Sequence, residues 1–484
     1  MAFEKRMFSY IVWGLHSILA CIGFAVILLK TLDATPLTNP YGQIGIVCLS
    51  FVLTAGVFLL VRKIANSCGG EGNGVRKAVA EAVAAVLLFA AGVTLRVLFL
   101  DKGMEEAAYF DMAQVNGEGI PSLSYGAQYL YVCMLRALFY AVGNHFTAGV
   151  ILQIVLQTGG ALVFYLAVRR FSGASAGIVA LAVLMFMPSA IREALVYSPR
   201  MLYFLLFSIV LLMVGRMTAR QKKDKFAWYG WLHTVLCGAA IAVVTYLDGA
   251  GVLLFIPVFG IVLAKERKRL LCQWGVVLAG FLAVLALLFF ADASLSGADF
   301  VSVCRVWAAS YVPQSPVLSD LVFLRENTVM ELVLLSVAAF VILLGLPGFF
   351  CSRREECQTP FMMLEIGLVL LCVCRTDHVQ ARYEYLMLAV FAAMTGAAVR
   401  AVSTHEKTGE DAEENSVSQL PAAVVALSEA VDPPEDGKVK LIDNPLPLPK
   451  RHVKKTMGYQ REVPPEEMHY DIEVEENDDF DLKK

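Results

Sequence analysis

Three carboxylates crowd one short polar stretch, 100–123, in an otherwise apolar sequence. Glu105, Glu106 and Asp111 fall within seven residues, and the stretch directly follows an apolar run at 78–99. Carboxylates placed just outside a hydrocarbon span are either solvated loop charges or groups that move protons at the membrane surface. We favour the second interpretation, with these three side chains as candidate catalytic residues.

The spacing within this stretch separates the acids if 104–112 is helical. Glu105 and Asp111 then lie on different faces, because six residues correspond to about 240° beyond a full turn. Glu106 and Tyr109 are three residues apart and share a face. We therefore expect one acid to face a site while the others face solvent, with Tyr109 as a candidate substrate contact.

Arginines accompany these acids in the segments that we assign to the same side of the membrane. Arginine presents a planar fork that matches phosphate oxygens, whereas the other loops mix lysine and arginine freely. Arg375, Arg382 and Arg192 are therefore candidates for binding an anionic lipid head group. The alternative is that they pair with nearby carboxylates or with lipid phosphates in general. His378, between the first two, could orient an acceptor or be an ordinary surface histidine.

A long connection at 291–327 adds two aromatic residues, Trp307 and Tyr311. Aromatic faces commonly pack on the apolar faces of sugars, so Trp307 is a candidate substrate contact. The alternative is that both rings only anchor the connection at the membrane–water interface.

The composition indicates a membrane protein that crosses the bilayer many times. Of 484 residues, 58% are hydrophobic and 17% are charged, against roughly 25% charged in soluble domains. Apolar runs of about 20 residues recur along the chain. They predict an all-α bundle of about twelve spans, near 8–30, 43–62, 78–99, 145–168, 174–190, 201–216, 230–247, 250–264, 271–291, 330–349, 361–375 and 383–400.

The distribution of basic residues decides how a thirteenth apolar run, Tyr125–Val142, should be interpreted. If this run lies on the outer surface, most basic clusters fall on one side, as expected for cytoplasmic loops. Its tyrosines and Arg136 also suit an interfacial helix. We therefore predict an outer interfacial helix and cytoplasmic termini; the alternative is a short true span.

This topology divides the chain into three parts. Residues 1–77 form two accessory spans, and 78–400 form the main region with outer loops at 100–144, 188–200, 291–329 and 375–382. Residues 401–484 carry 20 acidic against 10 basic side chains. Their low hydrophobicity predicts a disordered cytoplasmic tail, in which 441–484 is a possible binding segment for a cytoplasmic partner.

The cysteines do not indicate a metal centre or a disulfide framework. The eleven cysteines include no CxxC pair, and the seven histidines show no ligand spacing. We expect no metal ligands and no cofactor, although the sequence leaves a divalent metal open.

The layout resembles the polytopic glycosyltransferases of the GT-C class. The closest resemblance is to protein O-mannosyltransferases, aminoarabinose transferases and related bacterial lipid-linked sugar transferases. The resemblance rests on the run from Glu105 to Ala113 after a span, a surface helix at 124–142, the pair Arg169-Arg170 ending a span, and Arg382-Tyr383 before the last span. It covers about 78–400.

The resemblance implies an enzyme that transfers a sugar from a polyprenyl-phosphate donor to an acceptor on the outer face. The acceptor would be a cell-envelope glycan, lipid or protein. Glu105 would be the general base, with Glu106 second, and the arginines would stabilise the leaving phosphate. The localisation implied is the cell membrane, with membrane lipids as neighbours and no nucleic-acid partner.

Departures from the family pattern leave other functions open. The first acid is commonly Asp in the family but is Glu105 here, and Glu193 is the only acid in the loop after Pro188. One alternative is a transporter or flippase of lipid-linked glycans, which would require ionisable residues within spans. Another is an inactive scaffold that acts through its tail.

Overall fold

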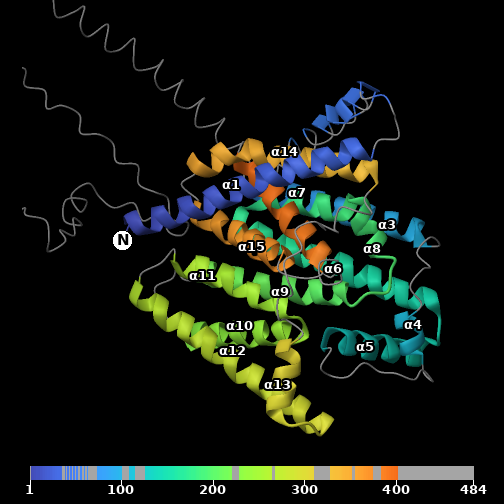
Figure 1. Ribbon diagram of the computed structural model, residues 1–484, viewed down its shortest axis with the longest axis vertical. Helices are drawn as coiled ribbons and strands as arrows, with labels where there is room; N and C mark the ends of the chain where they lie inside the picture. The colour runs from blue at the N-terminus through green and yellow to red at the C-terminus, as the bar shows by residue number, and fades with distance from the viewer. Residues whose placement is uncertain are drawn as a thin grey trace, which may run out of the picture. The chain divides into compact units, whose positions relative to one another are not determined.

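A computed structural model describes residues 2–34, 74–100, 108–114, 126–220, 228–263, 267–309, 328–351, 355–373 and 383–401, together with scattered residues between 39 and 63. These residues form helices, and none of them forms a strand. Long apolar segments satisfy their backbone groups internally only as helices, which explains this uniformity. The predicted all-α, polytopic fold is confirmed (Figure 1).

The helices follow one another with short connections. Their bounds are α1 Ala2–Asp33, α3 Gly74–Leu98, α4 Ala108–Ala113, α5 Gly126–Val142, α6 Phe146–Ser172, α7 Ala174–Phe186, α8 Pro188–Glu193, α9 Arg200–Arg220, α10 Trp228–Leu247, the 3₁₀ helix η2 Gly249–Leu254, α11 Phe255–Leu263, α12 Arg267–Ser296, α13 Phe300–Ala309, α14 Val329–Cys351, α15 Glu355–Val373 and a last helix, Tyr383–Ala401.

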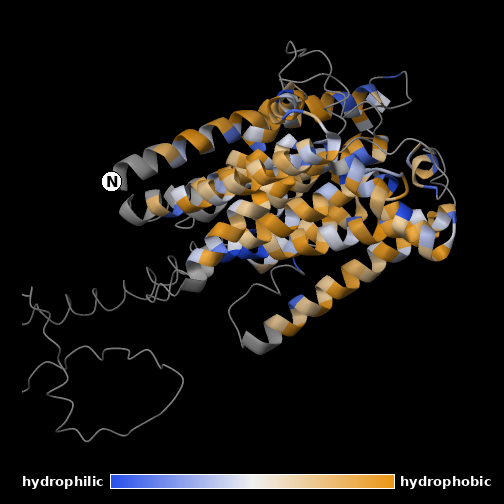
Figure 2. Ribbon diagram, turned by 90° about the horizontal axis from the view of Figure 1, so that it is seen from below, coloured by the Kyte–Doolittle hydropathy of each residue, from blue (hydrophilic) through white to orange (hydrophobic). Residues whose placement is uncertain are grey.

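Six helices in the described part of the chain are long and apolar enough to cross a membrane. They are Phe8–Asp33, Ala78–Leu98, Phe146–Ser172, Cys272–Ser296, Val329–Phe349 and Tyr383–Ala401. Apolar residues dominate the helices along their length (Figure 2). The total of about twelve spans stays a prediction, as does the interfacial position of α5. The tail beyond Ala401 lies outside the described residues.

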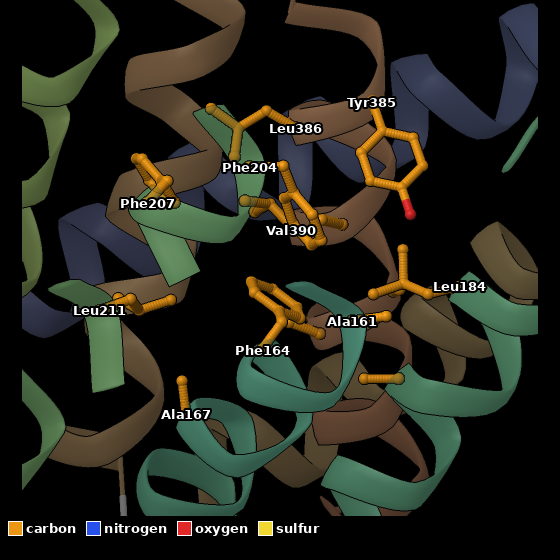
Figure 3. Packing of buried hydrophobic residues seen from close by; sticks show 14 of the residues in the cluster. Ala161, Phe164, Ala167, Leu184, Phe204, Phe207, Leu211, Tyr385, Leu386 and Val390 are labelled. Carbon is orange, nitrogen blue, oxygen red and sulfur yellow. The ribbon is translucent and has the colours of Figure 1, made fainter. Parts of the chain in front are cut away.

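The centre of the bundle is built from α6, α7, α9 and the last helix. Phe164 of α6 meets Phe204 of α9 at 5.7 Å between ring centroids, and Phe204 meets Tyr385 of the last helix at 4.9 Å (Figure 3). These side chains are almost completely buried. They hold the two ends of the bundle at fixed positions.

Two neighbouring regions are attached to this centre. In one, α10 packs along α12, where Gly238 and Gly280 let the backbones approach. In the other, α1 lies along α14 and α15 (Figure 1). The Trp13 indole donates to the Leu346 carbonyl at 3.1 Å, and Thr31 lies 3.2 Å from Ser336.

Polar contacts between distant segments define the two ends of the bundle. At one end Arg169 of α6 pairs with the buried Glu81 of α3, and Arg400 donates to the carbonyl of Ser172. Gly173 joins α6 to α7 there, with a φ of 93° that favours glycine. The other end carries α4, α5, α8 and α13, and we call it the α8 end. The sequence analysis assigned all four of these segments to the outer side.

Candidate functional site

α4 is the described part of the acidic stretch, and it is anchored at the α8 end by an aromatic cluster. Phe110 lies 5.4 Å from both Phe139 of α5 and Phe146 of α6, and 6.0 Å from Tyr197, which follows α8. Arg136 of α5 donates to the Met112 carbonyl at 2.8 Å. The chain that follows the predicted catalytic acids is therefore fixed against α5, α6 and the α8–α9 connection.

The predicted site residues of this stretch have different surroundings. Asp111 is exposed, and its nearest described partner is Gln114 at 3.4 Å. Tyr109 is half-buried and packs edge-on against Tyr131 of α5, with ring centroids 5.8 Å apart. Glu105 and Glu106 lie outside the described residues, as do Arg375, Arg382 and His378.

The α7–α8 break is held by a buried arginine. Pro188 follows Met187 and ends α7, because the residue before a proline is disfavoured in the helical conformation. The last-turn carbonyls of α7 are then capped by Arg96 of α3, which donates to Leu184 and Met185 at 3.1 and 3.0 Å. Arg96 also donates to Gln157 of α6 at 2.6 Å.

Gln157 continues this network into α8. Its amide donates to the carbonyl of Ala190, in the middle of α8. One turn earlier on α6, Gln153 accepts from Tyr131 at 3.0 Å and donates to the carbonyl of Ser198 at 2.9 Å. Two neighbouring glutamines of α6 thus fix both α8 and the connection that leads to α9.

Charged residues meet around α8. Arg200, at the start of α9, donates to Glu193 at 2.9 Å, and both are partly exposed. Arg192 lies 3.8 Å from Glu331, at the start of α14. Glu384, at the start of the last helix, is half-buried and interacts electrostatically with all four of these residues. We call these five residues the α8 charge cluster.

Glu331 is the most buried member of the α8 charge cluster. The residue is 1% exposed, and its Oε1 accepts the backbone N–H of Ser189 at 3.0 Å. Its Oε2 makes no hydrogen bond to any described residue. Arg192, by contrast, keeps 48% of its side chain exposed. A buried carboxylate oxygen without a hydrogen bond beside a half-exposed guanidinium is a typical feature of a functional site rather than of a packed core.

Two further contacts join α10 to this end. The Tyr383 hydroxyl donates to the buried Asp248, which also accepts the Ala250 N–H and so caps η2. The Trp307 indole of α13 donates to the Tyr246 carbonyl at 3.3 Å. Burial raises the pKa of Tyr197, so its hydroxyl stays protonated and donates to the Phe146 carbonyl at neutral pH.

The arrangement can bind an anion and accept a proton. Arg192 and Arg200 are both accessible to a charged ligand, and the carboxylates of Glu193 and Glu384 stand beside them. Within the described ranges, no group of three or more His, Cys, Asp or Glu side chains could hold a metal ion. The expectations of no metal and no cofactor stay predictions.

The structure brings together only one of the residues predicted to bind phosphate, Arg192. Sequence reasoning did not select Glu331, Glu384 or Arg96 as functional. A signal existed for the first two, because each is an acid within the first turn of a strongly apolar helix at the predicted outer side. Their meeting with α8 depends on helix packing, which the sequence pattern does not specify.

Comparisons with known proteins give little. No family model matches the chain, and no curated protein matches it. Among solved structures, the fold is similar to the crystal structure of the Archaeoglobus fulgidus oligosaccharyltransferase in its apo form, with a TM-score of 0.45 and 13% identity. The match covers 70% of this chain and 52% of that chain, so this chain matches about half the length of that protein. A similarity of this size does not define a family or an activity.

Proposed function

We propose that this protein is a membrane glycosyltransferase of the GT-C type. It moves a sugar from a polyprenyl-phosphate donor to an acceptor on the outer face of the cell membrane. The observation that carries the proposal is the α8 charge cluster, in which Arg192 and Arg200 meet three carboxylates at the start of the last helix, α9 and α14. The resemblance of the segment Glu105–Ala113 to the acidic loop of this class supports it.

The charge cluster suits the chemistry of sugar transfer. The acceptor hydroxyl oxygen forms a bond to the anomeric carbon, and the bond from that carbon to the phosphate oxygen breaks. The electron pair leaves with the lipid phosphate, whose growing negative charge is stabilised by fixed guanidinium groups. The hydroxyl proton passes to a carboxylate, help that is typically worth about 10²–10⁴-fold in rate.

The roles follow from this scheme. Glu105 is the proposed general base, with Glu106 and Asp111 as neighbouring acids, and Arg375 and Arg382 hold the phosphate. The described structure adds Arg200 beside Arg192 to the anion-binding side, and it adds the firm seat of α4 directly after the acids.

The experiment is complementation of cells that lack the protein. Glu105→Gln and Arg382→Ala should each abolish the product seen in envelope glycan and glycolipid profiles, while membrane insertion stays intact by immunoblot of the membrane fraction. Unchanged profiles for both variants would remove the mechanism.

One observation favours a second candidate function, a transporter or flippase of lipid-linked glycans. His16 of α1 is 0% exposed, and its Nδ1 lies 2.6 Å from Oε2 of Glu365 in the middle of α15. Ionisable pairs inside apolar helices often mark transport pathways. If this protein were a transporter, Glu365→Gln would stop the movement of a fluorescent lipid-linked glycan across proteoliposome membranes. As a transferase, it would show no such movement even with the natural residue.

A further inference from the structure

Asp292 is a buried acid that the charge cluster does not use. It lies near the end of α12 and is 1% exposed. Its Oδ2 accepts the Tyr246 hydroxyl at 3.0 Å, whereas its Oδ1 is buried and makes no hydrogen bond to the described residues. Buried polar atoms in folded proteins almost always have a partner, so Oδ1 needs a donor.

Aromatic rings surround this carboxyl group. Phe289, one turn earlier on α12, lies 5.7 Å from the Tyr246 ring and 5.3 Å from the Trp307 ring, measured between centroids. Trp307 belongs to α13 and is only half-buried. Among the residues of α13, Val303 alone is fully buried. The helix is therefore a thin cover over Asp292.

This carboxyl–aromatic group lies close to the α8 charge cluster. Tyr246 ends α10, and two residues later Asp248 accepts the Tyr383 hydroxyl. Glu384 of the charge cluster follows Tyr383 directly in the chain. A ligand bound at Asp292 would therefore stand at the same end of the bundle as the proposed transfer chemistry.

We propose that Asp292, Tyr246 and Trp307 form a subsite for a neutral pyranose ring. The bare Oδ1 accepts a hydrogen bond from a sugar hydroxyl, and the half-buried indole covers the apolar C–H face of the ring. A carboxylate repels phosphate, so this subsite takes a sugar rather than the lipid phosphate. The proposal rests on the proposed function, since it supplies a sugar position beside the transfer site.

The test measures sugar binding without any transfer step. Saturation-transfer difference NMR on the full-length protein in nanodiscs would use methyl α-mannopyranoside, methyl β-glucopyranoside and methyl β-galactopyranoside as probes. At least one should bind saturably. Asp292→Asn, which places an amide N–H₂ where Oδ1 stood, should weaken that binding about tenfold or more. The matched control is Asp299→Asn, an exposed acid just before α13 that should bind as the natural protein does.

A second variant and a stability measurement complete the design. Because Oδ1 has no partner to lose, Asp292→Asn should not lower the thermal unfolding midpoint. If that variant nevertheless fails to fold, Trp307→Ala decides, because α13 is little buried. Trp307→Ala should weaken binding to a similar extent.

Two results would overturn the subsite. One is the absence of saturable binding by all three probes, and the other is binding to Asp292→Asn and Trp307→Ala as tight as to the natural protein. If binding is absent while Glu105→Gln still abolishes the cellular product, the subsite alone fails. Intact binding with no effect of the Glu105 and Arg382 variants removes the transferase proposal alone.

Discussion

The guanidinium of Arg96 is completely buried, and it has no carboxylate partner among the described residues. Its donors go to Gln157 and to the carbonyls of Gly92, Leu184 and Met185. These bonds hold the end of α7 and, through Gln157, the middle of α8. Arg96 therefore acts on the charge cluster indirectly, by positioning Arg192 and Glu193.

Replacement of this arginine tests its structural weight. Arg96→Met keeps much of the side-chain volume but leaves Gln157 and two carbonyls at the end of α7 unpaired. Each buried polar group left without a partner costs about 1–3 kcal/mol, so we expect a loss of at least about 2 kcal/mol in the free energy of unfolding. Thermal unfolding in nanodiscs measures it. The account of the α7–α8 break is wrong if the midpoint stays within error of the natural protein.

At the same scale, the sequence predicted part of the candidate site. Arg192 was selected because arginine suits phosphate, and the structure places it in a charge cluster. Glu331 and Glu384 were not selected, because their meeting with α8 joins segments that are far apart in the chain. Local spacing carries no information about such contacts, whereas it does predict that Glu106 and Tyr109 share a face.

Among the helices, the α10–α12 pair depends on the absence of two side chains. A Cβ added at Gly238 would collide with the carbonyl oxygen of Val277, and one at Gly280 would meet the carbonyl oxygen of Val235 at 2.8 Å. Close backbone approach through small residues is a common way to pack membrane helices. The contact is therefore specific to these two positions.

Alanine substitutions at two glycines of this pair should have opposite effects. Gly238→Ala forces α10 and α12 apart, which should cost about 1–3 kcal/mol as overpacking does. Gly275→Ala is the matched control on α12, because nothing lies within 4 Å of its added Cβ. It should be neutral or stabilising by about 0.5–1 kcal/mol. Equal unfolding midpoints for the two variants would contradict this packing.

The helices were largely predictable, and their breaks were less so. The apolar run at 174–190 predicted one helix, but Pro188 divides it into α7 and α8. The run at 250–264 begins with a 3₁₀ helix, because Asp248 caps the first turn after α10. Hydrophobicity sets the length of an apolar segment, whereas proline and capping residues set where its helices begin and end.

For the whole molecule, the account joins the predicted topology to the charge cluster. The contacts at the α8 end bring together segments that the distribution of basic residues assigned to the outer side. Orientation in the membrane and the role of the tail stay predictions. The polytopic fold could be predicted from composition, because apolar runs of this length have few other solutions.

The central claim is that this end of the bundle consumes a lipid-linked sugar, and the most direct test is the level of that donor. Lipid extracts of cells that lack the protein would be analysed by mass spectrometry after complementation with the natural chain, Arg200→Ala or Arg216→Ala. Arg216 is the matched control, an exposed arginine far along α9 from Arg200. A polyprenyl-phosphate sugar should accumulate without the protein and with Arg200→Ala, and it should return to its normal level with the natural chain and Arg216→Ala. No accumulation of such a lipid without the protein, or equal levels for Arg200→Ala and the natural chain, would contradict the account.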